Sequence, residues 1–171
     1  MRLFRSPKLL LPLVLLLAGC QQQERTNLQY DMGERIENGP FTYVVVESAW
    51  RSDLGEGFQV RAPKNRFLLL TISVTNGGGS DISVPMFSVE GPNGQKYQEL
   101  SDGAGVPNWL GVLRTVRPAE TLQGRILFDV PLSTFRLGLP DSGETGYEKY
   151  AWVNIPMSLG DNTVQSPLPG Q

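Results

Sequence analysis

Apolar and polar residues alternate along the middle of the chain, and this alternation is the pattern of half-buried β-strands. The clearest run spans residues 66–75, where one face of an extended chain would be entirely apolar. A second run spans residues 123–130, and nothing between residues 31 and 156 keeps apolar residues at helical spacing over three turns. The side chains that we expect in the core are Leu68, Leu70, Ile72, Val74, Ile126, Phe128, Val130, Ala151, Val153 and Ile155.

Shorter runs of the same kind complete the set of predicted strands. They lie at residues 42–50, 82–90, 95–100, 110–116 and 150–155. The connections have turn chemistry, because three glycines follow Asn76 and the sequence Gly-Pro-Asn-Gly at 91–94 is typical of a hairpin turn. About seven to eight short strands separated by such turns predict an all-β protein whose antiparallel strands pack as a β-sandwich.

The N-terminal segment differs in composition from the rest of the chain. Residues 1–8 are basic and residues 9–18 are almost entirely apolar. Ten residues of helix would rise only about 15 Å, which is half of the ~30 Å hydrocarbon layer of a membrane. A basic region, a short apolar region and small residues at its end are typical of a secretory signal peptide. We therefore predict a signal peptide at residues 1–19 that is removed, rather than a transmembrane helix.

The end of this segment, Leu17-Ala18-Gly19-Cys20, resembles the lipobox of bacterial lipoproteins. That resemblance implies cleavage before Cys20 and attachment of a diacylglyceryl group to its thiol. Two or three acyl chains hold a protein on a membrane almost permanently, since each buried methylene contributes roughly 0.8 kcal/mol. The alternative is an ordinary secreted protein, but the single cysteine of the chain stands at the one position that lipidation requires.

These features divide the chain into four parts. After the signal peptide we expect the lipidated Cys20 with a polar tether at residues 20–30, one sandwich domain at 31–157, and a flexible tail at 158–171. The tether reaches at most about 33 Å when extended, which keeps the domain close to the membrane. In a cell with two membranes, Gln21 after the cysteine would by the same resemblance direct the protein to the outer membrane.

Composition narrows the possible function classes. The chain of 171 residues suffices for one domain with a core. Without residues 1–19, which carry three basic residues and no acid, 12 Lys and Arg oppose 17 Asp and Glu, and this balance argues against a nucleic-acid partner. The absence of His removes the commonest general base and metal ligand, and a single Cys excludes an intramolecular disulfide.

Acidic residues in two loops are weak candidates for chemistry. Residues 141–146 include Asp141 and Glu144, whose oxygens could bind Ca²⁺, but a dense alternation of acids is missing and a solvated turn is favoured. Glu99 and Asp102 could form the carboxylate pair of a glycoside hydrolase, but the neighbouring Gly, Ser and Asp residues predict exposure rather than a desolvated cleft. We expect no catalytic residue, no metal site and no cofactor.

Aromatic and apolar side chains on the outer faces of strands are the candidate interaction residues. Tyr150 and Trp152 alternate with core positions, so they point outward and could stack on a sugar ring or anchor a protein partner. Phe67, Leu69 and Leu127 lie opposite core positions and would form an apolar patch that needs a partner or a covering loop. Other aromatic candidates, of which one or two are expected to fill the space between the sheets, are Trp50, Trp109 and Tyr147.

Four segments together resemble a known bacterial family. They are residues 33–46, 65–76, 84–97 and 116–131, and they include a Gly, two residues and a Tyr at the turn 94–97. In this order behind a lipobox they are similar to the domain of unknown function 4352, some of whose members are labelled telomeric-repeat-binding factors. The resemblance covers about residues 31–156 and implies an immunoglobulin-like fold on a lipoprotein, but it implies no reaction. Gly91 and Ala119 depart from the family pattern.

The sequence therefore predicts a membrane-anchored, extracytoplasmic lipoprotein that is not an enzyme. Its immunoglobulin-like domain would act as an interaction or envelope-structural module with a protein partner in the cell envelope. Two alternatives remain open. One is a lipoprotein that presents a glycan, a cell-wall fragment or Ca²⁺ to other machinery, and the other is an envelope hydrolase built on paired acids.

Overall fold

The computed structural model describes residues 29–143 and 148–158, and its regular structure is almost entirely β. One 3-10 turn, η1, spans Gly57–Gln59. The strands are β1 (Gln29–Asp31), β2 (Ile36–Asn38), β3 (Phe41–Arg51), β4 (Arg66–Asn76), β5 (Ile82–Ser83), β6 (Ser88–Glu90), β7 (Lys96–Gln98), β8 (Thr115–Val116), β9 (Thr121–Val130), β10 (Phe135–Pro140) and β11 (Tyr150–Ile155).

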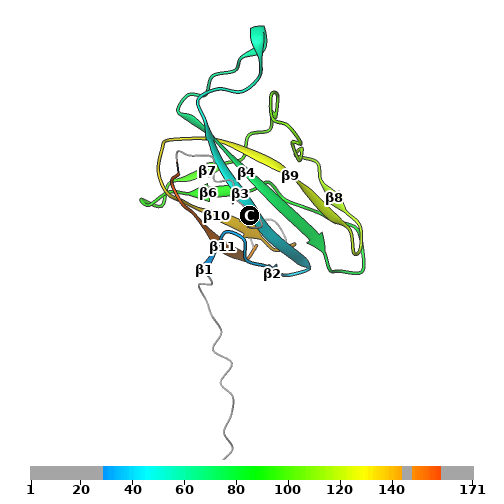
Figure 1. Cartoon of the computed structure of the whole chain (residues 1–171). Coiled ribbons are helices and arrows are strands. Elements are labelled where there is room, and N and C mark those ends of the chain that lie inside the picture. Colours follow the sequence, from blue (N-terminus) through cyan, green and yellow to red (C-terminus); the bar gives the residue numbers. More distant parts are fainter. Residues whose placement is uncertain (1–28, 144–147, 159–171) are drawn as a thin grey trace, which may run out of the picture.

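Two sheets packed face to face form a sandwich (Figure 1). The five-stranded sheet has the order β1-β11-β10-β6-β7, and the four-stranded sheet has the order β2-β3-β4-β9. A small separate sheet consists of β5 and β8. The long strands β3, β4 and β9 pair antiparallel along almost their whole length, with one bulge in β3 between Val45 and Glu47. The predicted all-β sandwich is confirmed.

The main core lies between the two sheets. Every side chain that the alternation assigned to the core is buried there, from all three predicted segments. Trp50 joins this core with 7% of its surface exposed, and its ring lies 6.2 Å from that of Phe135. Trp50 is therefore one of the aromatic residues that fill the space between the sheets.

Buried hydrogen bonds tie the two layers together at one end of the sandwich. The Tyr43 hydroxyl on β3 donates to the carbonyl oxygen of Pro140 on β10 over 2.7 Å. Burial raises the pKa of this phenol, so it stays a neutral donor. Beside it, the Asn38 amide donates to the carbonyl oxygens of Leu139 and Lys149 at 2.8 and 2.9 Å. These bonds fix the four-stranded sheet against β10 and the start of β11.

Two features of the five-stranded sheet differ from the sequence prediction. β1 pairs parallel with β11, so this sheet is mixed, and its first residues, Gln29 and Tyr30, belong to the fold rather than to the tether. β10 was not predicted at all, because Gly138 and Pro140 have low strand propensity and mask the alternation of its apolar residues. In the separate two-stranded sheet, the predicted strand at 110–116 is reduced to the two residues of β8.

The expected apolar patch on the four-stranded sheet is not available to a partner. Phe67, Leu69 and Leu127 are buried in a second, smaller core outside that sheet. Two loops cover them, and these loops contribute Leu54 and Val106. Of the two outcomes that the pattern left open, a covering loop is therefore the one observed. Loops distant in sequence supply the cover, so the strand pattern alone could not reveal it.

The covering loops are held together by close backbone contacts. The backbone of Leu54 exchanges two hydrogen bonds with that of Arg61 at the base of the first loop. A Cβ added to Gly105 in the second loop would stand 2.8 Å from the backbone nitrogen of Gly55, so only glycine permits this approach. The Arg61 guanidinium also lies 3.4 Å from the Asp102 carboxylate. These contacts make the second core an integral part of the fold.

Candidate functional site

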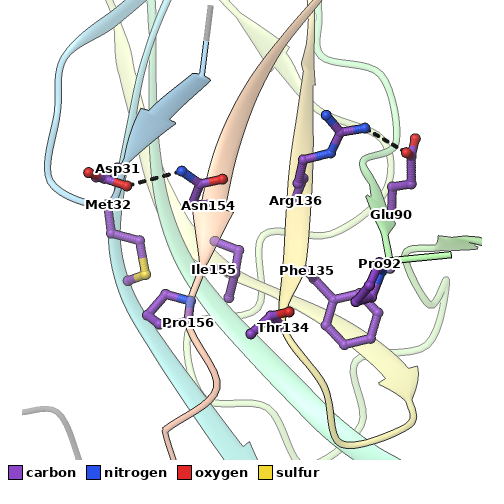
Figure 2. Close-up of a pocket in the computed structure, with 11 residues that line it drawn as sticks. Asp31, Met32, Glu90, Pro92, Thr134, Phe135, Arg136, Asn154, Ile155 and Pro156 are labelled. Atoms are coloured by element: carbon purple, nitrogen blue, oxygen red, sulfur yellow. Dashed lines mark hydrogen bonds and ion pairs between the residues drawn. The ribbon is translucent and has the colours of Figure 1, made fainter. Parts of the chain in front are cut away.

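A pocket of about 710 Å³ opens where β1, β6, β10 and β11 begin or end (Figure 2). We call it the strand-end pocket. Polar side chains form one row along it and apolar side chains lie in a second row beside them (Figure 2). The residues that line it are Asp31, Met32, Glu90, Gly91, Pro92, Thr134, Phe135, Arg136, Asn154, Ile155 and Pro156.

Strand register explains the polar row of the strand-end pocket. Asp31 is paired with Asn154, Asn154 with Arg136, and Arg136 with Glu90, so the four residues cross the sheet in one line. Each alternates with an inward-facing neighbour, which places all four on the outer face. The Asn154 amide donates to the Asp31 carboxylate over 3.1 Å, and the Arg136 guanidinium donates to Glu90 over 2.6 Å.

The charges of the row do not balance. Arg136 is neutralised by Glu90, whereas Asp31 makes no ion pair within residues 29–143 and 148–158. The pocket beside it has an apolar wall that includes Met32, Phe135 and Ile155. An apolar group with a neighbouring positive charge would therefore complement this site.

Next to the pocket, two aromatic rings lie on the outer face of the sheet. The Arg136 guanidinium carbon is 4.8 Å from the centroid of the Trp152 ring, a cation–π contact. The Tyr150 ring follows at 5.8 Å from that of Trp152, and 43% of Tyr150 is exposed. Both rings lean over Gly138, where a Cβ would stand 3.1 Å from Tyr150 and 3.2 Å from Trp152. We call Arg136, Tyr150 and Trp152 the aromatic face; Arg136 joins it to the strand-end pocket.

Glu99 does not occupy the exposed loop position that the sequence predicted. It is 3% exposed, accepts a hydrogen bond from the Phe87 backbone N–H at 3.1 Å, and forms a buried ion pair with Arg114. Burial raises the pKa of the Glu99 carboxyl, and the Arg114 guanidinium lowers it in part. Asp102 is exposed and pairs with Arg61 instead. The two acids therefore have separate structural partners and form no acid–base pair.

The loop at residues 141–146, for which a solvated turn was favoured over a Ca²⁺ site, lies only partly within the described residues. Asp141 Oδ1 accepts the backbone N–H groups of Gly143 and Lys149, both at 3.0 Å, so this carboxylate closes a turn. Glu144 and Tyr147 lie outside the described residues, as does Cys20. In the two stretches that the structure does describe, no three His, Cys, Asp or Glu side chains are grouped to hold a metal ion. Those stretches also contain no helix long and apolar enough to cross a membrane.

The alternation of apolar and polar residues indicates the outward position of the aromatic pair but not the strand-end pocket. Tyr150 and Trp152 lie on the outer face, as their alternation indicated. Arg136 and Phe135 were missed because β10 itself was missed, although Phe135, Leu137 and Leu139 alternate with Arg136 and Gly138. Glu90 reaches the pocket through the pairing of β6 with β10, and Asp31 and Met32 reach it because β1 pairs with β11, a long-range parallel contact without a local signal.

A family model for a domain of unknown function, DUF4352, matches residues 30–145. The chain belongs to the DUF4352 family. The match covers the sandwich from β1 through β10 and ends before β11. The family resemblance drawn from the four segments is thereby confirmed, whereas β11 with its two aromatic residues lies beyond the family model. A search of curated proteins finds no match for this DUF4352 protein.

Solved structures share the fold of this DUF4352 protein at low sequence identity. The yjhA protein of Bacillus subtilis is 14% identical, with a TM-score of 0.58 over 74% of this chain and 99% of that one. A secreted protein of Mycobacterium tuberculosis, MPT63, is 18% identical, with a TM-score of 0.56 over 75% and 98%. The candidate lipoprotein ycdA of B. subtilis is 14% identical, with a TM-score of 0.54 over 72% and 39%. At these identities the likeness is one of fold.

Proposed function

We propose that this DUF4352 protein is a lipid-anchored, extracytoplasmic binding module without catalytic activity. Its partner is an envelope protein that docks on the aromatic face and inserts a side chain into the strand-end pocket. The observation that carries the proposal is the continuity of these two sites through Arg136, which contacts Trp152 and lines the pocket.

The composition of this surface favours a protein partner. Trp, Tyr and Arg are the residue types enriched in the hot spots of protein interfaces, and all three are contiguous here. The partner would place an apolar side chain against the wall of the strand-end pocket and a neighbouring basic side chain near Asp31. The Arg136–Glu90 ion pair would hold the Trp152 ring in place while the partner docks.

The anchoring part of the proposal rests on the N-terminal sequence. Cys20 ends the lipobox-like segment, and Gln29 already lies in β1, so the eight residues 21–28 separate the proposed lipid from the fold. This spacer spans at most about 30 Å. Gln29 is paired with Trp152, so the spacer joins the domain at the aromatic face. If the cell has two membranes, Gln21 supports the outer one.

The contacts of the acidic candidates support a function without catalysis. Glu99 is held by Arg114, Asp102 by Arg61, and Asp141 by backbone N–H groups of its own turn. A glycoside hydrolase needs two carboxyl groups that face one substrate, one of them desolvated and free to donate a proton. These three acids do not meet that requirement, which leaves binding as the better-supported activity.

Crosslinking in intact cells tests the proposal, with the protein at native abundance and adducts identified by mass spectrometry. We expect one recurrent protein adduct with the natural chain. The adduct should be lost with Cys20→Ala, which releases the domain from the membrane, and strongly reduced with Trp152→Ala. Phe58→Ala is the matched control, because it removes a fully exposed aromatic side chain from η1, far from the aromatic face in sequence.

Anchoring is measured separately, from the mass of the N-terminal peptide of the membrane fraction. A diacylglyceryl group on Cys20 is the expected result, and an unmodified Cys20 on a soluble protein would contradict the anchor. Confirmed anchoring without any protein adduct would contradict the docking part. Equal loss of the adduct in Trp152→Ala and Phe58→Ala would show that the aromatic face is not the site.

A further inference from the structure

We propose that the protein carries a second binding site, for a neutral saccharide, in a cavity beside Trp109. The cavity has a volume of about 470 Å³ and opens on the outer face of the four-stranded sheet. It is lined by Glu47, Thr71, Asn108, Trp109, Leu110, Leu122, Gln123, Gly124 and Arg125. This site goes beyond the proposed protein-docking function and does not depend on it, because the two sites lie on different sheets.

A cross-strand row of polar side chains forms the floor of the cavity. Glu47 on β3 is paired with Thr71 on β4, and Thr71 is paired with Arg125 on β9. The Thr71 hydroxyl donates to the Glu47 carboxylate over 3.2 Å, and the Arg125 guanidinium lies 3.7 Å from the same carboxylate. Both charged side chains keep about a third of their surface exposed, at 35% and 33%. They are therefore fixed in place and still open to a ligand.

Trp109 is held as the wall of this cavity by its backbone and by a glycine. The backbone N–H of Leu110 donates to the Arg125 carbonyl at 2.9 Å, and that of Arg125 donates to the Asn108 carbonyl at 2.8 Å. Asn108 itself has a φ of 54°, a left-handed conformation that non-glycine residues seldom adopt. Gly103 lies so close to the Trp109 ring that a Cβ there would overlap it. The ring position is thus determined on both sides.

The Trp109 indole also has an unused donor. Its Nε1 is buried and has no hydrogen-bond partner within residues 29–143 and 148–158. A buried donor without a partner costs free energy, and most such groups in native proteins are satisfied. Because the surrounding residues cover this nitrogen, a ligand hydroxyl would supply the missing acceptor if the cavity wall beside the ring shifts when the ligand binds.

The chemistry of the cavity selects a neutral ligand rich in hydroxyl groups. Glu47 and Arg125 cancel one another, so the site has no net charge to attract an anion or a cation. Carboxylate, guanidinium, hydroxyl and amide groups together can donate to and accept from neighbouring sugar hydroxyls. Trp109 adds an amphipathic ring beside them. The face continues past the cavity with further hydroxyl groups, which could hold the next sugar units; these are Ser73, Thr75 and Thr121.

Nuclear magnetic resonance of the indole N–H groups tests the proposal on the chain from residue 20 onward, with Cys20→Ser to keep it in solution. The chain has three Trp residues and therefore three indole signals. We would titrate it with N-acetylglucosamine and cello-oligosaccharides of two to four units. The Trp109 signal should shift in a saturable way with at least one series, while the signals of Trp50 and Trp152 stay in place.

Two variants separate a specific site from a general effect. Trp109→Phe keeps a ring against Gly103 but lacks the indole donor, so the dissociation constant should rise about tenfold. Phe58→Ala, which removes an exposed aromatic side chain from η1, should leave the affinity unchanged. A Trp109 signal unmoved at 20 mM of every oligosaccharide, or equal weakening by both variants, would overturn the proposal. Since no partner protein is present, neither outcome bears on the protein-docking function.

Discussion

The Arg136 guanidinium lies between the Trp152 ring, 4.8 Å from its centroid, and the Glu90 carboxylate at 2.6 Å. Three neighbouring strands, β6, β10 and β11, supply these residues, and their register places them in adjacent rows of the outer face. Because the guanidinium contacts both side chains, each of them is held in one conformation before a partner binds. This lowers the entropy cost of binding. We regard Arg136 as the residue that joins the aromatic face to the strand-end pocket.

Trp152→Ala should change stability little while it removes partner binding. The ring lies on the outer face, over Gly138 and outside both cores, so the free energy of unfolding should fall by about 1 kcal/mol or less. Denaturant unfolding of the natural and variant chains measures the difference. A loss of more than about 3 kcal/mol would assign the ring a role in folding and weaken its assignment as a contact residue.

Leu127→Ala should destabilise the protein strongly, because Leu127 is fully buried under the covering loops. Large-to-small substitutions in a core cost about 2–5 kcal/mol. Leu113→Ala is the matched control, since that leucine is 98% exposed, and it should change the free energy of unfolding by no more than about 0.5 kcal/mol. Similar small losses in both variants would mean that the second core is not closed in solution.

Arg114→Met should destabilise the fold by leaving the Glu99 carboxylate buried without a cation. Removal of one member of a buried ion pair costs about 3–5 kcal/mol. Arg114 also lies 5.1 Å from the Phe87 ring centroid and donates to the Gly111 carbonyl, so the same change loosens the loop that precedes β8. Thermal and denaturant unfolding at neutral pH measure the loss.

The pH dependence of the stability of Arg114→Met distinguishes the effect of the unpaired Glu99 charge from the effect of the lost packing contacts. Burial already raises the pKa of Glu99 in the natural chain, and without Arg114 this pKa must rise further. A carboxyl whose pKa is raised by folding favours the folded state when protonated, and that contribution is lost as the pH rises through the raised pKa. The deficit of Arg114→Met relative to the natural chain should therefore shrink as the pH falls towards the ordinary carboxyl range. A deficit independent of pH would assign the loss to packing.

Tyr43→Phe isolates one hydrogen bond between the two layers. The change keeps the ring in the core but leaves the Pro140 carbonyl oxygen without its donor. An unsatisfied buried acceptor costs about 1–3 kcal/mol, and we expect a decrease of that size in the free energy of unfolding. Unfolding followed by fluorescence and by circular dichroism should remain coincident. An unchanged midpoint would show that water replaces the hydroxyl at this position.

The sequence was informative where one strand carries one apolar face. Leu68, Leu70, Ile72 and Val74 alternate without interruption, and all four are buried between the sheets. It was less informative where both faces are apolar, since a pattern cannot show which side a loop will cover. Phe67 is the example: its outward position was predicted correctly, but its burial depends on Leu54 and Val106 from distant loops.

The candidate-site residues show the same difference between positions set by the local sequence and positions set by distant residues. Tyr150 and Trp152 could be placed on an outer face from β11 alone. Glu99 could not be assigned, because its local sequence is polar whereas its partner Arg114 lies fifteen residues away and shields it from water. The strand-end pocket requires β1 beside β11, a parallel contact between the two ends of the domain. Such contacts are set by the closure of the whole sandwich.

The most direct test of the docking claim is site-specific photocrosslinking in intact cells. p-Benzoylphenylalanine would replace Tyr150 on the aromatic face in one strain and Phe58 on η1 in another, so that both positions exchange one exposed aromatic residue for another. We predict a single protein adduct from position 150, none from position 58, and loss of the adduct when Cys20→Ala is combined with the probe. No adduct from position 150, or the same adducts from both positions, would contradict the account.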